Sequence, residues 1–443
     1  MGRMLQRLCL LWALVASVTA LSEVERQKII AKYSTSKSES ILVTNRSSLN
    51  TSDLAQFSLL ARNTYAKVLP CLKSAWMMKD KESVPLRFPL DAEEHYQYVK
   101  KKTRHFRNVQ VHEYIDYEGP WIENLWIQEF MNKPLSYFGG MVPLFIQWID
   151  SQILRGDHFN KIAEALNTLL RPDVIYITVS QGDVGLGFIG TQHPNILVLS
   201  AGGFGHIPIP LVKSEVPHRP LQHHLDYLNV TLGDGDDGRH IKGLKAQSYK
   251  YDIGFFGTLN QWNSNRQDIL ATIKKKATEL NMTIKYEQTA DWQKEMGHSK
   301  FNLCPRGYGR SSFRYAESIQ IGRIPVFLWD DVPWIPYQGT NLSIEHFGFQ
   351  RGTKSQTVKL SPEGIRRKEE EEQTLEGIVQ ELHELSDREY KSKLLKLHAA
   401  RWHFTYPGVL HQIKLFIANP FDKHEGGQLR CIKHPKTERC CDN

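Results

Sequence analysis

The chain has 443 residues, more than one hydrophobic core usually serves and enough for two ordinary domains. Hydrophobic residues make up 41% and charged residues 23% of the chain, which is the composition of a soluble globular protein. The formal net charge of +8 invites a nucleic-acid function, but the basic residues are scattered, without a long basic run, a zinc-ligand pattern or an RNP-like sequence. We therefore expect no nucleic-acid partner; steeply salt-dependent binding to DNA would contradict this.

Residues 1–20 have the layout of a secretory signal peptide. Arg3 and Arg7 supply the positive charge, residues 8–18 are apolar, and residues 18–20 carry the small side chains that a signal peptidase needs. The apolar run is shorter than the ~20 residues of a bilayer span, which favours cleavage. The alternative is a short signal anchor that would associate the protein with a membrane through its N-terminus.

Residues 21–63 are polar and rich in Ser and Thr, which predicts a flexible stem. Glycosylation sequons have meaning only in the secretory pathway, so they support a lumenal or extracellular location. The five sequons begin at Asn45, Asn50, Asn229, Asn281 and Asn341.

The chain has six cysteines, and Cys9 would leave with the signal peptide. An oxidising compartment could pair at most four of the remaining five, leaving one thiol that is buried or pairs between chains. Cys431 with Cys440 or Cys441 is a candidate local bridge in the polar tail, residues 421–443. No C-x-x-C pattern occurs, so we expect no structural zinc site.

Helices and strands alternate in the N-terminal half. The spacing of apolar residues predicts helices over residues 120–132, 141–154 and 157–170, and strands over 107–115, 174–179 and 195–200. Alternation of this kind implies parallel pairing, in which ligands bind beyond the carboxyl ends of the strands. The loops 180–185 and 201–206 lie there, and they contain the two candidate proton acceptors, Asp183 and His206. For each of these, a loop-stabilising role is an equally good interpretation.

Residues 233–245 are glycine-rich, charged and without apolar periodicity, which is typical of a linker between domains. They separate an N-terminal domain, residues 64–245, from a C-terminal domain, residues 246–420. The D-x-D sequence at residues 234–236 matches a known metal-binding motif, but no strand precedes it and no calcium-loop spacing follows. We interpret it as surface linker and predict no metal site.

The C-terminal half alternates more clearly. Strands are predicted over residues 251–256 and 282–286, and helices over 266–280 and 290–298. Residues 361–400 are predicted to be mainly helical. The order β-α-β predicts a doubly wound parallel sheet with right-handed connections.

Residues 300–334 carry the strongest chemical signal of the chain. A strand that Pro305 ends is followed by a glycine-rich turn, a helix from Ser312 to Gly322 and a buried strand over residues 324–328. A glycine turn that leads into a helix N-terminus is an anion site, because backbone N–H groups and the positive end of the helix dipole face one point.

Charged side chains surround this predicted anion site. Arg306, Arg310 and Arg314 bear guanidinium groups that can bind phosphate oxygens in bidentate fashion. Glu317 could accept hydrogen bonds from a ribose diol, or it could orient Arg314 as an ordinary i,i+3 pair. Asp330 and Asp331 follow the next strand; they could face a sugar or be solvated loop acids.

The sequence of residues 301–326, F-N-L-C-P-R-G-Y-G-R-S-S-F-R-Y-A-E-S-I-Q-I-G-R-I-P-V, resembles the donor-binding signature of the exostosin-like glycosyltransferases, glycosyltransferase family 47. The resemblance implies an α/β fold of the GT-B type, with two Rossmann-like domains facing each other across a cleft. It also implies an inverting glycosyltransferase of polysaccharide or glycoprotein synthesis whose donor is a UDP-sugar and whose acceptor is a glycan. Members of this family suggest a location in the Golgi lumen with a membrane anchor, and secretion is the other expectation. The nucleotide-sugar site is expected to comprise Arg306, Gly307, Ser311, Ser312, Arg314, Glu317 and Asp331.

In such an enzyme the N-terminal domain presents the acceptor and a catalytic base, for which Asp183 is the first candidate and His206 the second. The family's tryptophan-asparagine-arginine and aspartate-histidine stretch is not well kept here, and Asp183 is its nearest counterpart. No cofactor is expected to be required, because arginines and a helix N-terminus can stabilise the leaving diphosphate, although a divalent metal could assist. The alternative is a secreted glycan-binding protein that keeps the fold without catalysis.

Overall fold

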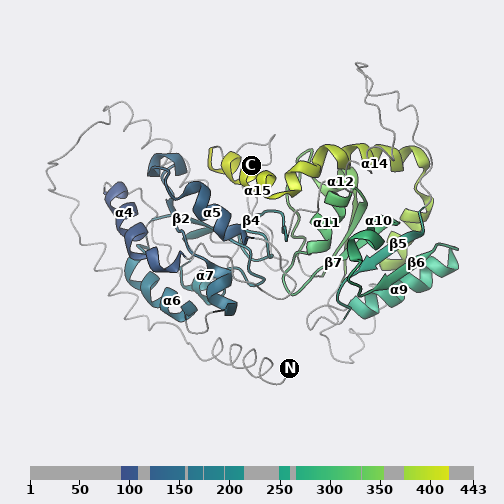
Figure 1. Cartoon of the computed structure of the whole chain (residues 1–443), viewed down its shortest axis with the longest axis horizontal. Coiled ribbons are helices and arrows are strands. Elements are labelled where there is room, and N and C mark those ends of the chain that lie inside the picture. Colours follow the sequence, from purple (N-terminus) through teal and green to yellow (C-terminus); the bar gives the residue numbers. More distant parts are fainter. Residues whose placement is uncertain are drawn as a thin grey trace, which may run out of the picture.

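The computed structural model describes residues 91–107, 120–154, 158–172, 174–193, 195–213, 249–259, 266–330, 332–353 and 374–418. The predicted signal peptide, the stem, the linker 233–245, the tail and most of the predicted strand 107–115 lie outside these ranges. So do Asp331, the sequons at Asn45, Asn50 and Asn229, and every cysteine except Cys304. The described residues form two α/β units, the N-terminal one at the left of Figure 1 and the C-terminal one at the right.

The N-terminal unit contains a four-stranded sheet in which all described strands are parallel. The strands follow the order β1-β2-β3-β4: β1 (Val142–Pro143), β2 (Tyr176–Ser180), β3 (Ile196–Ser200) and β4 (Ile207–Pro208). Its helices are α4 (Ala92–Lys102), α5 (Ile122–Phe130), α6 (His158–Leu169) and α7 (Phe188–Gln192). Short turns complete it: η1 (Arg104–Phe106), η2 (Leu135–Phe138) and the π-helical η3 (Asp150–Leu154).

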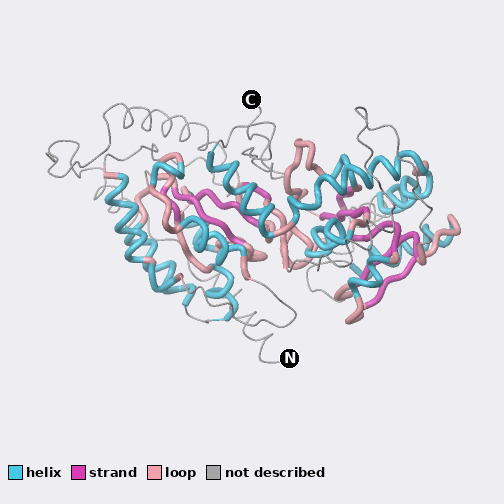
Figure 2. The backbone as a smooth tube through the Cα atoms, turned by 45° about the horizontal axis from the view of Figure 1, so that its top comes forward, coloured by secondary structure: helices cyan, strands magenta, loops and turns pink. Residues whose placement is uncertain are grey.

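The C-terminal unit contains a five-stranded parallel sheet in the order β6-β5-β7-β8-β9. Its strands are β5 (Tyr251–Phe256), β6 (Ile284–Glu287), β7 (Ser299–Pro305), β8 (Ile324–Trp329) and β9 (Phe349–Gly352), and its helices α9 (Arg266–Glu279), α10 (Trp292–Gly297), α11 (Phe313–Ile321) and α12 (Ile344–Phe347). Figure 2 shows the strands as two separate groups, each flanked by helices. The chain runs from β5 outward to β6 and then back to β7 on the other side of β5, so the topological switch point lies between β5 and β7.

Hydrophobic patterning explains these elements. Every residue of β2 and β3 is buried, as expected for central parallel strands covered on both faces. In α6 the buried Phe159, Ile162 and Leu166 recur at helical spacing. Cys304 is buried in β7, and α11 ends at Gly322, whose φ of 81° suits a glycine at a helix C-terminus.

The carboxyl edges of the two sheets, at which their strands end, face each other. Trp334, beyond β8, donates from Nε1 to the Ser200 carbonyl at the end of β3, at 3.0 Å. Two parallel Rossmann-like domains arranged in this way constitute the GT-B type of fold, so the predicted fold class is confirmed. A further helix pair, α14 (Asp387–Ala400) and α15 (Tyr406–Ala418), follows the second sheet.

The last described helix, α15, crosses back to the N-terminal unit (Figure 1) and contacts α5 and η2. Gln412 donates from Nε2 to the Pro208 carbonyl at 3.2 Å, and Lys414 pairs with Glu129 of α5 at 2.5 Å. The last described helix therefore joins the C-terminal unit to the N-terminal one.

One predicted helix is wrong. Over residues 141–154 the structure has strand β1, an extended segment and the π-helical turn η3. The physical reason is that all residues from Met141 to Ile149 are buried, so the run is not amphipathic, and Pro143 cannot donate a helical hydrogen bond. In the described part of residues 361–400, residues 374–384 and α14 are helical as predicted, with a break at Ser386, which caps α14 together with Glu389.

Candidate functional site

The candidate site lies where β5 and β7 end, at the switch point of the C-terminal sheet. Arg266, the first residue of α9, is only 5% exposed and joins the two strand ends. Its guanidinium donates to the carbonyls of Thr258 at 2.8 Å, Pro305 at 3.1 Å and Arg306 at 3.1 Å. Burial, followed by the charge of Arg314, lowers the pKa of Arg266 to about 10. Sequence reasoning missed this residue, although a cation in the first turn of a helix, where the dipole disfavours it, is a signal.

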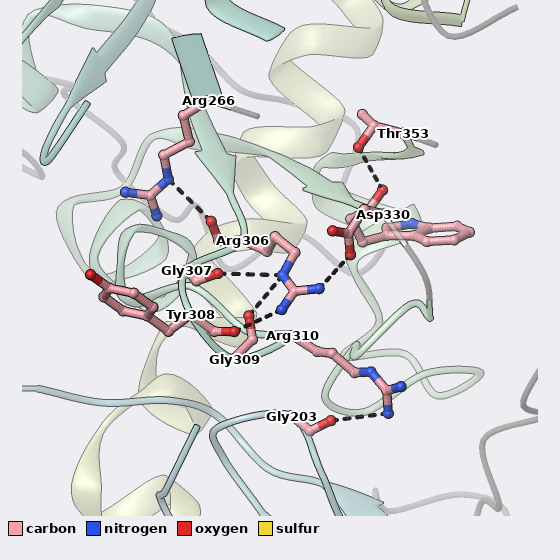
Figure 3. A network of polar contacts seen from close by, with 10 residues as sticks. Gly203, Arg266, Arg306, Gly307, Tyr308, Gly309, Arg310, Asp330 and Thr353 are labelled. Carbon is pink, nitrogen blue, oxygen red and sulfur yellow. Dashed lines mark hydrogen bonds and ion pairs between the residues drawn. The ribbon is translucent and has the colours of Figure 1, made fainter. Parts of the chain in front are cut away.

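The glycine-rich loop after β7 is folded around the side chain of Arg306 (Figure 3). Its Nε donates to the carbonyls of Gly307 at 3.3 Å and Gly309 at 3.0 Å, and Nη2 donates to the Tyr308 carbonyl at 2.7 Å. Nη1 pairs with Asp330 at 2.5 Å, and both side chains of this ion pair are largely buried. Arg306, predicted as a phosphate ligand, is thus directed at its own loop and at Asp330.

The loop leads into the N-terminus of α11 as predicted. Ser312 occupies the N-cap position with an extended backbone, φ −144° and ψ 129°, but its side chain makes no capping hydrogen bond. The Ser311 carbonyl accepts from the Gly307 N–H at 2.9 Å, which closes the turn. Both serines are 3% exposed. The positive end of the α11 dipole therefore points at the switch point, which suits an anion.

Arg314 and Glu317 form an ion pair on the first turns of α11. Glu317 is 1% exposed, and its Oε1 has no hydrogen-bond partner among the described residues. The Arg314 guanidinium lies 4.2 Å from the ring centre of Trp292, the first residue of α10. A Cβ at Gly257, directly after β5, would lie 3.1 Å from Arg314 Nε, so the glycine leaves room for this arginine. Sequence reasoning missed Trp292 because no spacing in the sequence indicates that α10 packs its first residue against Arg314 of α11.

Asp183 lies in the loop after β2 and approaches the glycine-rich loop of the other domain. It accepts a hydrogen bond from the Gly309 N–H, and Arg306 attracts its charge. Burial of the carboxyl group raises its pKa, while these two contacts oppose the rise. The residue still has an exposed surface. The structure thus brings Asp183 to the predicted nucleotide-sugar loop, although the two lie more than 120 residues apart in sequence.

His206 has a different environment. It is fully buried, and its Nδ1 accepts a hydrogen bond from the Val198 N–H at 3.0 Å. Its own backbone N–H donates to the Val198 carbonyl at 2.8 Å. The imidazole ring therefore holds the loop after β3 against its strand. Because His206 is fully buried, the geometry favours Asp183 over His206 as the candidate catalytic base.

The loops of the two domains touch along a surface that we call the interdomain seam: Gly202, Gly203 and Phe204 on one side, Gly309 and Arg310 on the other. A Cβ at Gly309 would overlap the Gly202 carbonyl oxygen, and one at Gly203 would overlap the backbone of Arg310. The Arg310 guanidinium lies 4.1 Å from the centre of the Phe204 ring and donates to the Gly203 carbonyl at 3.5 Å (Figure 3). The described structure is therefore closed along this seam.

Among the described residues no group of three or more His, Cys, Asp or Glu side chains is placed to hold a metal ion. Nor does any helix in the described ranges have the length and apolar character to cross a bilayer.

No protein-family model matches the chain, and no curated protein matches it in sequence. Solved structures similar to it include the pneumococcal O-GlcNAc transferase GtfA in complex with UDP and GlcNAc, at 11% identity and a TM-score of 0.29, over 55% of this chain and 44% of that one. A GtfA/B complex matches at 9% identity and a TM-score of 0.28, over 59% of this chain and 60% of that one. The chain thus spans less than two thirds of either structure.

Proposed function

We propose that the chain is a glycosyltransferase that moves a sugar from a nucleotide-sugar to a glycan or glycoprotein acceptor. The observation that carries the proposal is the environment of Glu317, a buried carboxylate at the switch point. Its Oε2 pairs with Arg314, and its Oε1 has no hydrogen-bond partner among the described residues. A buried acceptor of this kind is costly unless a ligand donates to it, and a ribose diol can do so.

The neighbouring groups suit the rest of a nucleotide diphosphate. Arg314 and the N-terminus of α11 stabilise the negative charge that develops on the leaving diphosphate. Arg306 supports them indirectly, because it holds the shape of the loop that carries Gly307 and Ser311. A uridine base and membership of the exostosin-like family rest on the resemblance of residues 301–326.

The proposed reaction is an inverting displacement. The acceptor hydroxyl oxygen forms a bond to the anomeric carbon, the bond from that carbon to the diphosphate oxygen breaks, and Asp183 takes the hydroxyl proton. Desolvation of its carboxyl group beside the other domain raises the pKa of Asp183, which makes it a better proton acceptor than a carboxylate of ordinary pKa. Because Asp183 touches Gly309, base and donor loop belong to one site when the domains close.

The closed interdomain seam favours a second candidate, a catalytically inactive glycan-binding protein of the same fold. Thermal shift of the intact chain with a panel of nucleotide-sugars separates the two. An enzyme is stabilised by one donor, since a ligand that binds only the folded state raises its stability by mass action. A chain that responds to glycans and to no nucleotide-sugar would support the second candidate.

Arg314→Ala tests the donor site directly. We expect it to lower transfer at least 100-fold while the protein stays folded, because loss of one charged group that stabilises the leaving group costs roughly 10²–10³ in rate. Arg351→Ala is the matched control, since Arg351 also pairs with a carboxylate, Glu381 at 2.6 Å, but lies on edge strand β9. Full transfer by the Arg314 variant would refute the assignment.

A further inference from the structure

Glu123, which sequence reasoning passed over, is a fully buried carboxylate in the first turn of α5. Its Oε1 accepts from the backbone N–H of Gln181 at 2.9 Å, the backbone N–H groups of Ile149 and Glu123 also lower the pKa of the carboxyl group, and its Oε2 has no hydrogen-bond partner among the described residues. In return, Gln181 accepts at Oε1 from the Ile122 N–H at 3.0 Å. This reciprocal pair fastens the start of α5 to the loop that leaves β2.

The same loop carries Asp183 two residues later, and its other end is fastened as well. Gly182 donates to the hydroxyl of Ser180 at 3.2 Å, and Gly185 donates to the Gly182 carbonyl at 2.9 Å. The Gln152 side chain donates to the Gly185 carbonyl at 3.0 Å. Asp183 thus sits on a short turn whose entry is held by Glu123 and whose exit is held by Gln152.

Few charged or titratable groups lie near Glu123. Burial raises its pKa to about 7 against the three backbone N–H groups, and Asp150 of η3 raises it slightly further. Glu129, on the same helix, is paired with Lys414 of α15. On β2, Tyr176 is the titratable residue. Beyond Gln181 the next charged group is Asp183 itself.

The C-terminal domain covers this cluster. Trp121, the N-cap residue of α5, and Ile149, the residue before η3, pack together with Phe313 at the start of α11. Glu123 therefore lies directly behind a contact between the domains.

We propose that Glu123 is a positioning residue for Asp183: its ionised carboxylate holds the Gln181 N–H and so fixes the turn on which Asp183 meets the acceptor. The catalytic half of this statement rests on the proposed function. A carboxylate is a stronger acceptor for N–H groups than a carboxylic acid, so protonation of Glu123 loosens the entry to the turn. The turn is then ordered above about pH 7 and looser below it.

Hydrogen exchange of the intact chain tests the structural half without any need for turnover. Peptides covering residues 180–185 are compared in wild type, Glu123→Gln and Glu129→Gln from pH 5.5 to 8.5, after correction for intrinsic exchange. In wild type and in the Glu129 control we expect protection to rise roughly tenfold as pH passes through 7. In the Glu123→Gln variant the protection of residues 180–185 should not change with pH. Equal pH dependence in all three proteins would overturn the proposal.

Transfer kinetics test the catalytic half. The pH profile of kcat should show an acid limb near pH 7 in wild type that Glu123→Gln removes with little change in KM. A limb that persists in this variant would overturn the positioning role. A wild type that transfers no sugar, yet shows the expected exchange behaviour, would instead refute only the proposed function. If Glu123→Gln does not fold, Glu123→Asp replaces it: a shorter carboxylate should lower protection at every pH while keeping the transition.

Discussion

Replacing Glu123 with glutamine should remove a large pH dependence from the stability of the protein. The folded state raises the pKa of this carboxyl from 4.5 to about 7, mainly because the side chain is fully buried. One pKa unit corresponds to 1.36 kcal/mol, so ionising Glu123 in the folded protein costs about 3 kcal/mol relative to the unfolded chain. Below pH 4.5 Glu123 is protonated in both the folded and the unfolded state, and its contribution to the free energy of unfolding is fully present. This contribution is lost as pH rises through about 7.

Glutamine cannot ionise, so the variant does not suffer this loss. We expect the unfolding free energy of Glu123→Gln minus that of wild type to increase by about 3 kcal/mol between pH 4.5 and pH 8. Other titrating groups cancel in this difference because both proteins share them. Urea denaturation of the intact chains, followed by circular dichroism at intervals of half a pH unit, measures it. A difference that stays constant with pH would show that Glu123 titrates normally and would refute the reasoning.

Three further predictions concern other parts of the molecule. Arg306→Ala should lower the unfolding free energy by about 3 kcal/mol, measured in urea, because it removes the largely buried ion pair with Asp330 and the guanidinium that donates to three loop carbonyls. Gly309→Ala should hold the domains apart, since its Cβ overlaps Gly202; an unchanged radius of gyration in small-angle scattering would contradict this. If the chain passes through the secretory pathway, as residues 1–20 predict, Asn281 and Asn341, both exposed, should carry glycans that peptide N-glycosidase removes, and mass spectrometry of each asparagine would show it.

Much of the fold follows from hydrophobic patterning alone. The strand over residues 251–256 has the predicted bounds, and the strand, turn and helix around residues 300–322 agree with the structure because each boundary has a strong local signal, Pro305, Ser312 or Gly322. The helix predicted over residues 141–154 is wrong because continuous burial does not distinguish a buried strand from a buried helix. Local sequence decides where amphipathic elements form, whereas tertiary contacts decide whether a continuously buried segment becomes a strand or a helix.

The site was harder to predict than the fold. Arg314 and Glu317 could be found because they belong to one helix, three residues apart. Arg266 and Trp292 could not, because their roles depend on two strand ends and on a neighbouring helix that meet only in the folded chain. The same holds for Glu123, whose partner Gln181 is 58 residues away.

The two arginines that frame the glycine-rich loop illustrate why residue type does not fix role. The guanidinium of Arg306 donates to the loop carbonyls and pairs with Asp330, so it stabilises the conformation of the loop. Arg314 has Glu317 on one side and the face of Trp292 on another, contacts that hold the guanidinium in place. A cation fixed in this way needs no reorganisation when negative charge develops beside it, which is the condition under which electrostatic stabilisation is most effective. We therefore expect the rate of the proposed transfer to depend on the orientation of Arg314 more than on the total number of arginines at the site.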